Sequence, residues 1–367
     1  MPGAAPQRIL VITLQRLGDV LLTTPLLRSL RKAWPQAQLD MLVFAGSEGI
    51  LAGNPDISNV LTISAKAGAA ETLRLAARIF RRYDLAISTQ AGDKPTMFAW
   101  LAGRRRIGIL TEKAVFKRWL LNRHVGRDLS VHRVVQSLRL LDGLDLEKPD
   151  VPLVPELVPP QGRSATDFIP QRRYAVLHPN PKFTYKRWNA QGWRDLAAGL
   201  SKRGLDVIVT GAPEPDERAY LDSLWRDTSL APRRLDGRLN WPQLAALIRG
   251  AAVYIGTDTS MTHLAAATGA PTVAIYGPVD PRIMGPWPVG GLNPPGSAPW
   301  EAAGTIQRRG NVWVVQNPAS CPWSCLPCEK LGCDGHLDSR AQCLDELSAG
   351  QVLAAVDAAL TAPASVS

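Results

Sequence analysis

The chain has 367 residues, of which 46% are hydrophobic, and its 42 Lys+Arg against 32 Asp+Glu give a formal net charge of +10. This length suits two or three domains, and the hydrophobic content is ample for globular cores. The N-terminus lacks the basic and apolar regions of a secretory signal, and no apolar run is long enough to cross a bilayer. We therefore expect a soluble, cytoplasmic protein.

The first expected element is a buried strand over residues 8–14, followed by the turn Arg16-Leu-Gly-Asp19 and an amphipathic helix pattern over residues 20–32. Asp19 thus lies at the carboxyl end of the first strand, where open parallel sheets bind ligands. The alternative is that Asp19 only caps the helix that begins near Val20.

The rest of the N-terminal half continues this α/β pattern. Further parallel strands are expected at 39–44 and 84–88, with helices around 71–82 and 131–142. Residues 151–162 are rich in proline and cannot form a regular helix. The sequence therefore predicts an N-terminal domain over 1–155 and a linker over 156–172.

Positive charge is concentrated in the N-terminal half, where residues 74–139 contain 15 Lys+Arg and 4 Asp+Glu. Phe116, Trp119, Leu120 and Leu121 interleave with basic residues, as on a helix that rests on an anionic membrane. The alternative is an ordinary solvated basic face. Nucleic acid is disfavoured as a partner, because no RNA-binding signature, zinc-finger spacing or basic-zipper pattern is present.

The C-terminal half repeats the strand–turn–helix arrangement. Strands are expected at 174–178, 206–210, 251–255 and 271–276, a helix at 190–203, and a C-terminal domain over 173–348. A long surface loop is expected over 286–310, and a helix within the C-terminal segment 349–367 is expected to pack back on the first domain. Two such units about 240 residues apart indicate two similar α/β domains facing each other.

The turn that begins at Gly256 is the strongest candidate for an anion site. It connects a buried strand to an alanine-rich helix, and Asp258 or Thr259 can cap that helix. Backbone amides of Thr259, Ser260 and Met261 would then bind a pyrophosphate at the helix start. His263 follows one turn later, either within reach of a phosphate or as a buried helix histidine.

All five cysteines fall in one loop, residues 321–343. Because disulfides are the poorer explanation in a reducing cytoplasm, this density favours a tetrahedral zinc or iron site of structural type. A redox bridge is the alternative. The expected ligands are Cys325, Cys328, Cys333 and Cys343, with Cys321 or His336 as substitutes.

Three motifs together resemble glycosyltransferase family 9, the bacterial heptosyltransferases of lipopolysaccharide core assembly. They are Leu17-Gly18-Asp19-Val20 with Thr24-Pro25, then Lys186-Arg187-Trp188, and finally Gly256–His263 continuing to Tyr276–Pro281. The resemblance spans most of residues 8–290. It implies a GT-B fold, in which an acceptor-binding and a nucleotide-sugar-binding Rossmann-like domain enclose the active site in a cleft.

The resemblance also implies roles for individual residues. Lys186 would be the cation on the departing diphosphate, with Arg187 and Lys182 as alternatives, and Asp19 would be the catalytic base. Asp258 would stabilise its turn or contact the donor sugar. Glu214 or Glu217 would contact the nucleotide ribose, and the spacing does not choose between them.

The implied reaction moves heptose from ADP-heptose to a lipid-anchored inner-core glycan at the inner face of the cytoplasmic membrane, with inversion. The absence of Asp-x-Asp favours metal-free transfer without a cofactor, and the absence of Gly-x-Gly argues against an oxidoreductase. Two alternatives remain. One is a related transferase with another nucleotide sugar or a protein acceptor, and the other is a non-catalytic module that binds nucleotide or anionic membrane. The nucleotide base, the exact acceptor, the metal and the oligomeric state stay open.

Overall fold

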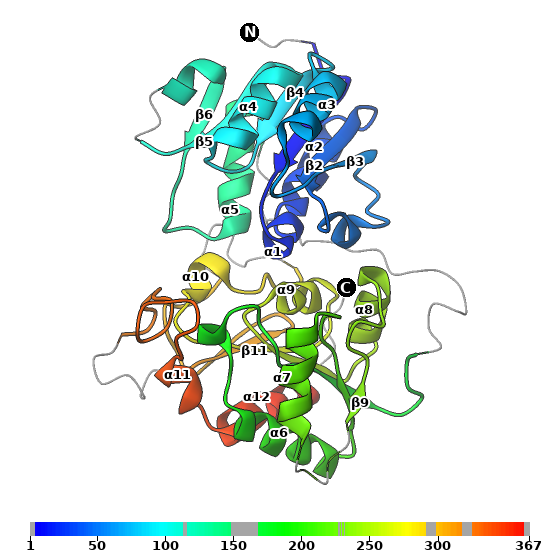
Figure 1. Cartoon of the computed structure of the whole chain (residues 1–367), viewed down its shortest axis with the longest axis vertical. Coiled ribbons are helices and arrows are strands. Elements are labelled where there is room, and N and C mark those ends of the chain that lie inside the picture. The colour runs from blue at the N-terminus through cyan, green and yellow to red at the C-terminus, as the bar shows by residue number, and fades with distance from the viewer. Residues whose placement is uncertain are drawn as a thin grey trace. The chain divides into compact units, whose positions relative to one another are not determined.

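The chain forms two compact units, each built around its own β-sheet (Figure 1). The computed structural model describes residues 4–112, 116–147, 168–226, 228, 230, 232–290, 299–317 and 325–362. The first unit holds the described residues up to 147, and the second holds those from 168 onward. Most of the predicted linker, 156–172, lies outside the described residues.

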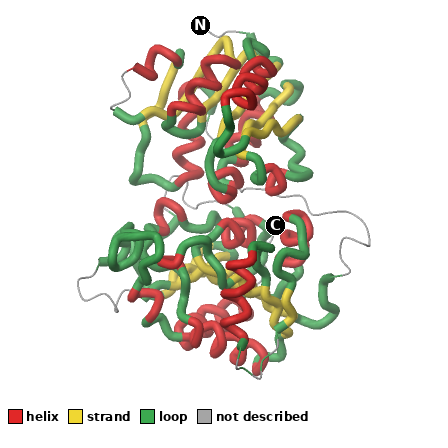
Figure 2. Tube along the Cα trace, in the orientation of Figure 1, coloured by secondary structure: helices red, strands yellow, loops and turns green. Residues whose placement is uncertain are grey.

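A six-stranded parallel sheet forms the centre of the first unit, with strand order β3-β2-β1-β4-β5-β6. Figure 2 shows helices flanking the strands. The strands are β1 (Arg8–Thr13), β2 (Gln38–Phe44), β3 (Asn59–Ile63), β4 (Tyr83–Ser88), β5 (Gly103–Leu110) and β6 (Arg123–Gly126). The helices are α1 (Leu17–Leu21), α2 (Thr24–Ala33), η1 (Glu48–Leu51), α3 (Ala69–Ile79), α4 (Asp93–Ala102), η2 (Phe116–Leu120), α5 (Arg133–Leu138) and η3 (Arg139–Leu144).

Strand β1 is central because its residues are almost wholly apolar and can be buried on both faces. Ile9 pairs with Leu39 of β2 on one side and with Leu85 of β4 on the other. One face of this sheet packs on α3 and α4, where Leu10 and Ile12 belong to the same buried cluster as Phe98. This core positions β1, which leads into helix α1 and Asp19.

The second unit has a seven-stranded sheet with the order β12-β13-β11-β10-β7-β8-β9. All neighbouring pairs are parallel except β12 with β13. The strands are β7 (Tyr174–His178), β8 (Asp206–Val209), β9 (Arg233–Arg234), β10 (Val253–Thr257), β11 (Thr272–Ile275), β12 (Ile306–Arg309) and β13 (Val312–Val315). The helices are η5 (Thr184–Lys186), α6 (Ala190–Lys202), α7 (Pro215–Trp225), α8 (Trp241–Arg249), α9 (Ser260–Ala267), α10 (Pro281–Met284), α11 (Gln342–Asp345) and α12 (Ala349–Thr361).

One expectation for this unit is wrong. The predicted loop over 286–310 contains β12, which pairs antiparallel with β13 and forms the edge of the sheet on that side. Within the second unit, helix α12 packs against α6 and β11. Small residues explain this packing, because Gly199 of α6 lies so close to Leu353 that a Cβ there would stand 2.7 Å from its side chain.

No helix in the described part of the chain combines the length and the apolar character needed to cross a bilayer.

Candidate functional site

The chain changes direction between β7 and β10, at the centre of the second sheet. From β7 the chain adds β8 and β9 on one side, and then returns to place β10 and β11 on the other. Open α/β sheets bind ligands at such a switch point, outside the carboxyl ends of the strands. The loop after β7 contains Lys186, and the turn after β10 contains Asp258 and Thr259. The two segments predicted to bind the donor therefore follow adjacent strands of the sheet.

The side chains of Lys186 and Asp258 form an ion pair. Both groups are largely removed from solvent, with side-chain exposures of 17% for Lys186 and 7% for Asp258. The Tyr276 hydroxyl lies 3.4 Å from Asp258 Oδ1 and donates to the carbonyl of Met284 at 2.9 Å. Burial and the adjacent carboxylate raise the pKa of Tyr276 well above its ordinary value, so this hydroxyl stays protonated. Asp258 therefore holds the lysine ammonium beside the start of α9.

Helix α9 begins without a side-chain cap. Thr259 is the N-cap residue and has extended backbone angles, but its side chain makes no capping hydrogen bond. Its buried hydroxyl has no hydrogen-bond partner. A helix start without a cap presents backbone N–H groups and the positive end of the helix dipole, which suit a phosphate. Of the other predicted residues, Met261 and His263 are buried and Ser260 is half-buried.

Asn180 is a candidate that the sequence analysis missed. It lies two residues after β7 and is 3% exposed, yet neither its amide nitrogen nor its amide oxygen has a hydrogen-bond partner. The hydroxyl of Thr257, at the end of β10, is buried and unpartnered in the same way. Leaving such a group unsatisfied costs about 1–3 kcal/mol, and each case in a native structure needs an explanation. A polar ligand at the switch point would supply the missing partners.

The remaining predicted donor residues lie around α7. The Arg187 guanidinium lies 4.3 Å from the ring centroid of Tyr220, and burial raises the pKa of Tyr220 to about 12. Glu217 accepts a hydrogen bond from the backbone N–H of Ala212 at 3.0 Å and thereby braces the loop after β8. Glu214 is the exposed N-cap residue of α7 and does not cap it through its side chain. The ribose contact stays a prediction. The side chain of Glu214 is less constrained than that of Glu217, which already accepts the hydrogen bond from Ala212.

The other lysine considered for the phosphate, Lys182, is exposed, and its ammonium lies 5.9 Å from the ring centroid of Phe183. It is not part of the ion pair with Asp258. Lys186 therefore has the stronger structural position of the two.

Next to this loop, His178 ends β7, and its Nδ1 lies 3.1 Å from the Thr210 hydroxyl. Burial lowers the pKa of this imidazole from 6.5 to about 4, so His178 is neutral in the folded protein near neutral pH.

This burial predicts a dependence of stability on pH. As the pH falls, His178 is protonated at a higher pH in the unfolded chain than in the folded protein. The free energy of unfolding is therefore expected to decrease as the pH falls from 6.5 to about 4. The contribution of this group is about 3 kcal/mol over that window. Urea unfolding at pH 7 and pH 5 measures it, and His178→Gln should remove this part of the pH dependence. The exposed His124 is the matched control, and an equal effect of His124→Gln would contradict the assignment.

In the first unit, Asp19 lies in the first turn of α1, which begins at Leu17 and has Arg16 as its N-cap residue. Asp19 is therefore not the cap residue of this helix. Its Oδ1 lies 3.2 Å from Nε of Arg133, with side-chain exposures of 17% and 14%. Arg133 also donates to the Gln15 side chain. Arg133, which the sequence analysis missed, thus fixes the orientation of the predicted base.

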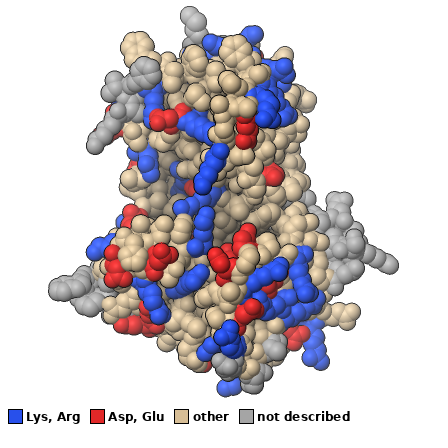
Figure 3. Space-filling model, in the orientation of Figure 1, with Lys and Arg blue, Asp and Glu red and all other residues tan. Residues whose placement is uncertain are grey.

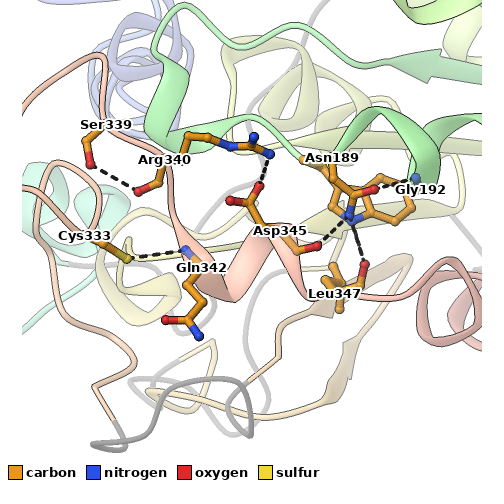
Figure 4. A network of polar contacts seen from close by, with 9 residues as sticks. Asn189, Gly192, Cys333, Ser339, Arg340, Gln342, Asp345 and Leu347 are labelled. Atoms are coloured by element: carbon orange, nitrogen blue, oxygen red, sulfur yellow. Dashed lines mark hydrogen bonds and ion pairs between the residues drawn. The ribbon is translucent and has the colours of Figure 1, made fainter.

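The Cys-rich segment, here the described residues 325–347, braces the loop that carries Lys186 (Figure 4). Trp188 Nε1 donates to the carbonyl of Leu347 at 2.9 Å, and Asn189 Nδ2 donates to the carbonyl of Asp345 at 2.9 Å. Asn189 also accepts from the backbone N–H of Gly192 at 2.6 Å, which caps α6. The segment therefore holds both the Lys-x-Trp motif and the helix that follows it.

The cysteines differ from the predicted ligand set in one respect. Cys325 forms a disulfide, so its sulfur is not a thiolate ligand here. Cys328, Cys333 and Cys343 carry free thiols, and burial raises the pKa of Cys343 to about 12. Among the described residues no group of three or more His, Cys, Asp or Glu side chains is arranged to hold a metal ion. Cys321 lies outside the described residues, and the zinc or iron site stays a prediction.

The sequence matches the family model described as glycosyltransferase family 9 (heptosyltransferase) over residues 72–290. Lipopolysaccharide heptosyltransferase 3 of Escherichia coli K12 is 28% identical over 285 residues, which cover 74% of this chain and 82% of that protein. Lipopolysaccharide heptosyltransferase 1 of Pseudomonas aeruginosa is 27% identical over 296 residues, covering 76% of this chain and 81% of the relative.

Solved structures share the fold over nearly the whole chain. The E. coli ADP-heptose lipopolysaccharide heptosyltransferase II matches with a TM-score of 0.74 and 20% identity, covering 96% of this chain and 98% of that one. An E. coli heptosyltransferase solved with ADP-2-deoxy-2-fluoro heptose matches with a TM-score of 0.67 and 20% identity, over 96% of this chain and 99% of that one.

Proposed function

The chain belongs to glycosyltransferase family 9, and we propose that it transfers heptose from ADP-heptose to an inner-core sugar of a lipid-anchored lipopolysaccharide acceptor. It is a glycosyltransferase, and its two Rossmann-like units have the GT-B fold. The observation that carries the donor proposal is the pairing of Lys186 with Asp258 beside the uncapped start of α9. This arrangement provides a cation and backbone N–H groups for one diphosphate.

The proposed reaction is a direct displacement. The acceptor hydroxyl oxygen forms a bond to the anomeric carbon as the bond from that carbon to the diphosphate oxygen breaks. The hydroxyl proton goes to the Asp19 carboxylate, and ADP leaves with the bonding electron pair. Attack from the side opposite the leaving group inverts the configuration at that carbon.

Stabilisation of the departing ADP would come from the second unit without a metal ion. The ammonium of Lys186 and the helix start of α9 would offset the negative charge that develops on the diphosphate. The amide of Asn180 would donate to the donor, which would satisfy a group that is otherwise buried without a partner. Each of these groups is supported by its position at the switch point of the sheet.

A lipid-anchored acceptor would bring the protein to the inner face of the cytoplasmic membrane as a peripheral protein. This choice is supported by the relatives, which are named lipopolysaccharide heptosyltransferases, and by the basic N-terminal half of the chain.

The donor proposal predicts a nucleotide preference. Calorimetric titration with ADP, UDP and GDP should give tight binding to ADP, and EDTA should leave that binding unchanged because no metal bridges the diphosphate. Asn180→Ala should weaken it by about 10-fold, the effect of one lost hydrogen bond near 1.4 kcal/mol. The same titration of Glu214→Gln and Glu217→Gln identifies the ribose contact. A preference for UDP or GDP would overturn the ADP-heptose donor, and loss of binding in EDTA would overturn the metal-free mechanism.

A further inference from the structure

Exposed apolar side chains gather on one helical layer of the first unit. Leu73 is 68% exposed, Phe80 58%, Met97 37%, Trp100 39% and Trp119 83%. They belong to α3 and the residue that ends it, to α4, and to η2. We call this surface the α3–α4–η2 face. Single exposed apolar residues are ordinary, but large ones on adjacent elements mark an interaction surface.

Contacts within the unit place the elements that carry these side chains next to one another. Helix α4 packs against both α3 and η2. The backbone N–H of Arg81 donates to the carbonyl of Leu101 at 2.9 Å, which brings the end of α3 beside the end of α4. Phe80 and Trp100, which directly precede these two residues, therefore lie at the same end of the layer.

The other end of α4 is tied to η2 in a similar way. Lys117 forms an ion pair with Asp93, the first residue of α4. Trp119 follows two residues later and projects into solvent. Met97 lies between the two ends of α4, so the apolar groups run along the whole helix.

Basic side chains surround these apolar groups. Residues 69–82, 93–104 and 116–120 contain eight Lys or Arg and two Asp or Glu. Arg74, Arg78, Arg81 and Arg118 are exposed. The space-filling view shows blue side chains gathered on this unit beside uncharged surface (Figure 3). Aromatic and aliphatic groups among positive charges match the interface of an anionic bilayer, where rings insert near the headgroups and cations contact phosphates.

We infer that the α3–α4–η2 face docks on the surface of an anionic phospholipid membrane. The choice of a membrane as the partner rests on the proposed function, because a lipid-anchored acceptor lies in such a surface. The inference goes beyond the expectation for residues 116–121 and partly corrects it. Leu121 is buried in the core of the unit, and the apolar contribution comes from α3 and α4 as well as from Trp119.

Vesicle co-sedimentation tests the docking face with the full chain. The wild type should bind vesicles of phosphatidylethanolamine and phosphatidylglycerol, and bind pure phosphatidylcholine far more weakly. Arg78→Gln with Arg118→Gln should weaken binding roughly 30-fold, because each basic residue near the membrane surface increases the binding affinity about five-fold. Phe80→Ser with Trp119→Ser should weaken it about 10-fold or more.

Matched variants on the second unit provide the controls. Arg226→Gln with Arg309→Gln removes two exposed charges, and Leu337→Ser removes an apolar side chain that is 46% exposed. Both should bind vesicles like the wild type. The proposal would be overturned if the face variants bound vesicles as tightly as the wild type, or if the controls lost as much binding as the face variants. It would also be overturned if the wild type bound phosphatidylcholine vesicles as tightly as the anionic vesicles. A dimer in solution that the face variants abolish, without any change in vesicle binding, would assign the face to a second copy of the chain.

Two further readouts separate this proposal from the proposed function. The face variants should bind ADP like the wild type and should transfer normally to a delipidated, water-soluble acceptor. Failure of the wild type to bind ADP would count against the proposed function and leave the vesicle result intact.

Discussion

Asp19→Asn is expected to lower kcat by roughly 10²–10⁴-fold, the usual contribution of a general base. The amide keeps the size of the side chain beside Arg133, but it cannot take the acceptor proton. ADP binding should be unchanged, because the groups proposed for the diphosphate belong to the second unit. Single-turnover transfer together with calorimetric ADP binding measures both quantities.

The matched control for Asp19 is Asp128→Asn. Asp128 pairs with Arg139 of the same unit at 2.6 Å, so this change also breaks an aspartate–arginine ion pair. Transfer by the control should stay close to that of the wild type. If Asp19→Asn retained normal kcat, or if the control lost as much, Asp19 would not be the base.

Lys186→Met is expected to have two separable effects. Loss of the cation should lower kcat/KM by about 10²–10³-fold, as for other single groups that stabilise developing negative charge. It also leaves the buried carboxylate of Asp258 without its cation, which should lower the free energy of unfolding by up to about 3 kcal/mol. Transfer assays and urea unfolding measure the two effects independently.

The double variant Lys186→Met with Asp258→Asn separates these effects. Neutralising Asp258 removes the unpaired charge, so most of the lost stability should return. Transfer should not recover, because the cation for the diphosphate is still missing. Recovery of transfer in the double variant would show that Lys186 serves only as the partner of Asp258.

Much of the fold could be predicted from local patterns. The apolar runs at 8–14, 84–88 and 174–178 form strands within one residue of the predicted bounds, since strands buried on both faces are apolar throughout. The polar turn after Gly256 separates two apolar segments, and the helix predicted to follow this turn begins at Ser260. Strand β12 was missed, as its sequence Ile-Gln-Arg-Arg is mostly polar and the strand depends on pairing with β13.

The candidate site was predictable where one short motif supplies the residues. The turn with Asp258 and Thr259 is such a case, and Lys186 was found through its own motif. The pairing of Lys186 with Asp258 spans 72 residues of sequence and required the order of the strands. The contact of Arg133 with Gln15 spans 118 residues and gives no local signal.

Asn180 shows a different limit. Its sequence neighbours are prolines, which suggest a loop and nothing more. What makes it a candidate is the combination of burial with missing hydrogen-bond partners, and both are properties of the folded unit. Such a residue can be identified only after the packing around it is known.

The bracing of the Lys186 loop by the Cys-rich segment has a consequence for the order of folding during synthesis. Trp188 and Asn189 bind the main chain of residues that are 159 and 156 positions later. These contacts of the loop that carries Lys186 can form only after residues 345–347 have left the ribosome, later in synthesis than β7, β10 and the start of α9. The proposed nucleotide site therefore cannot be complete until most of the second unit has been synthesised.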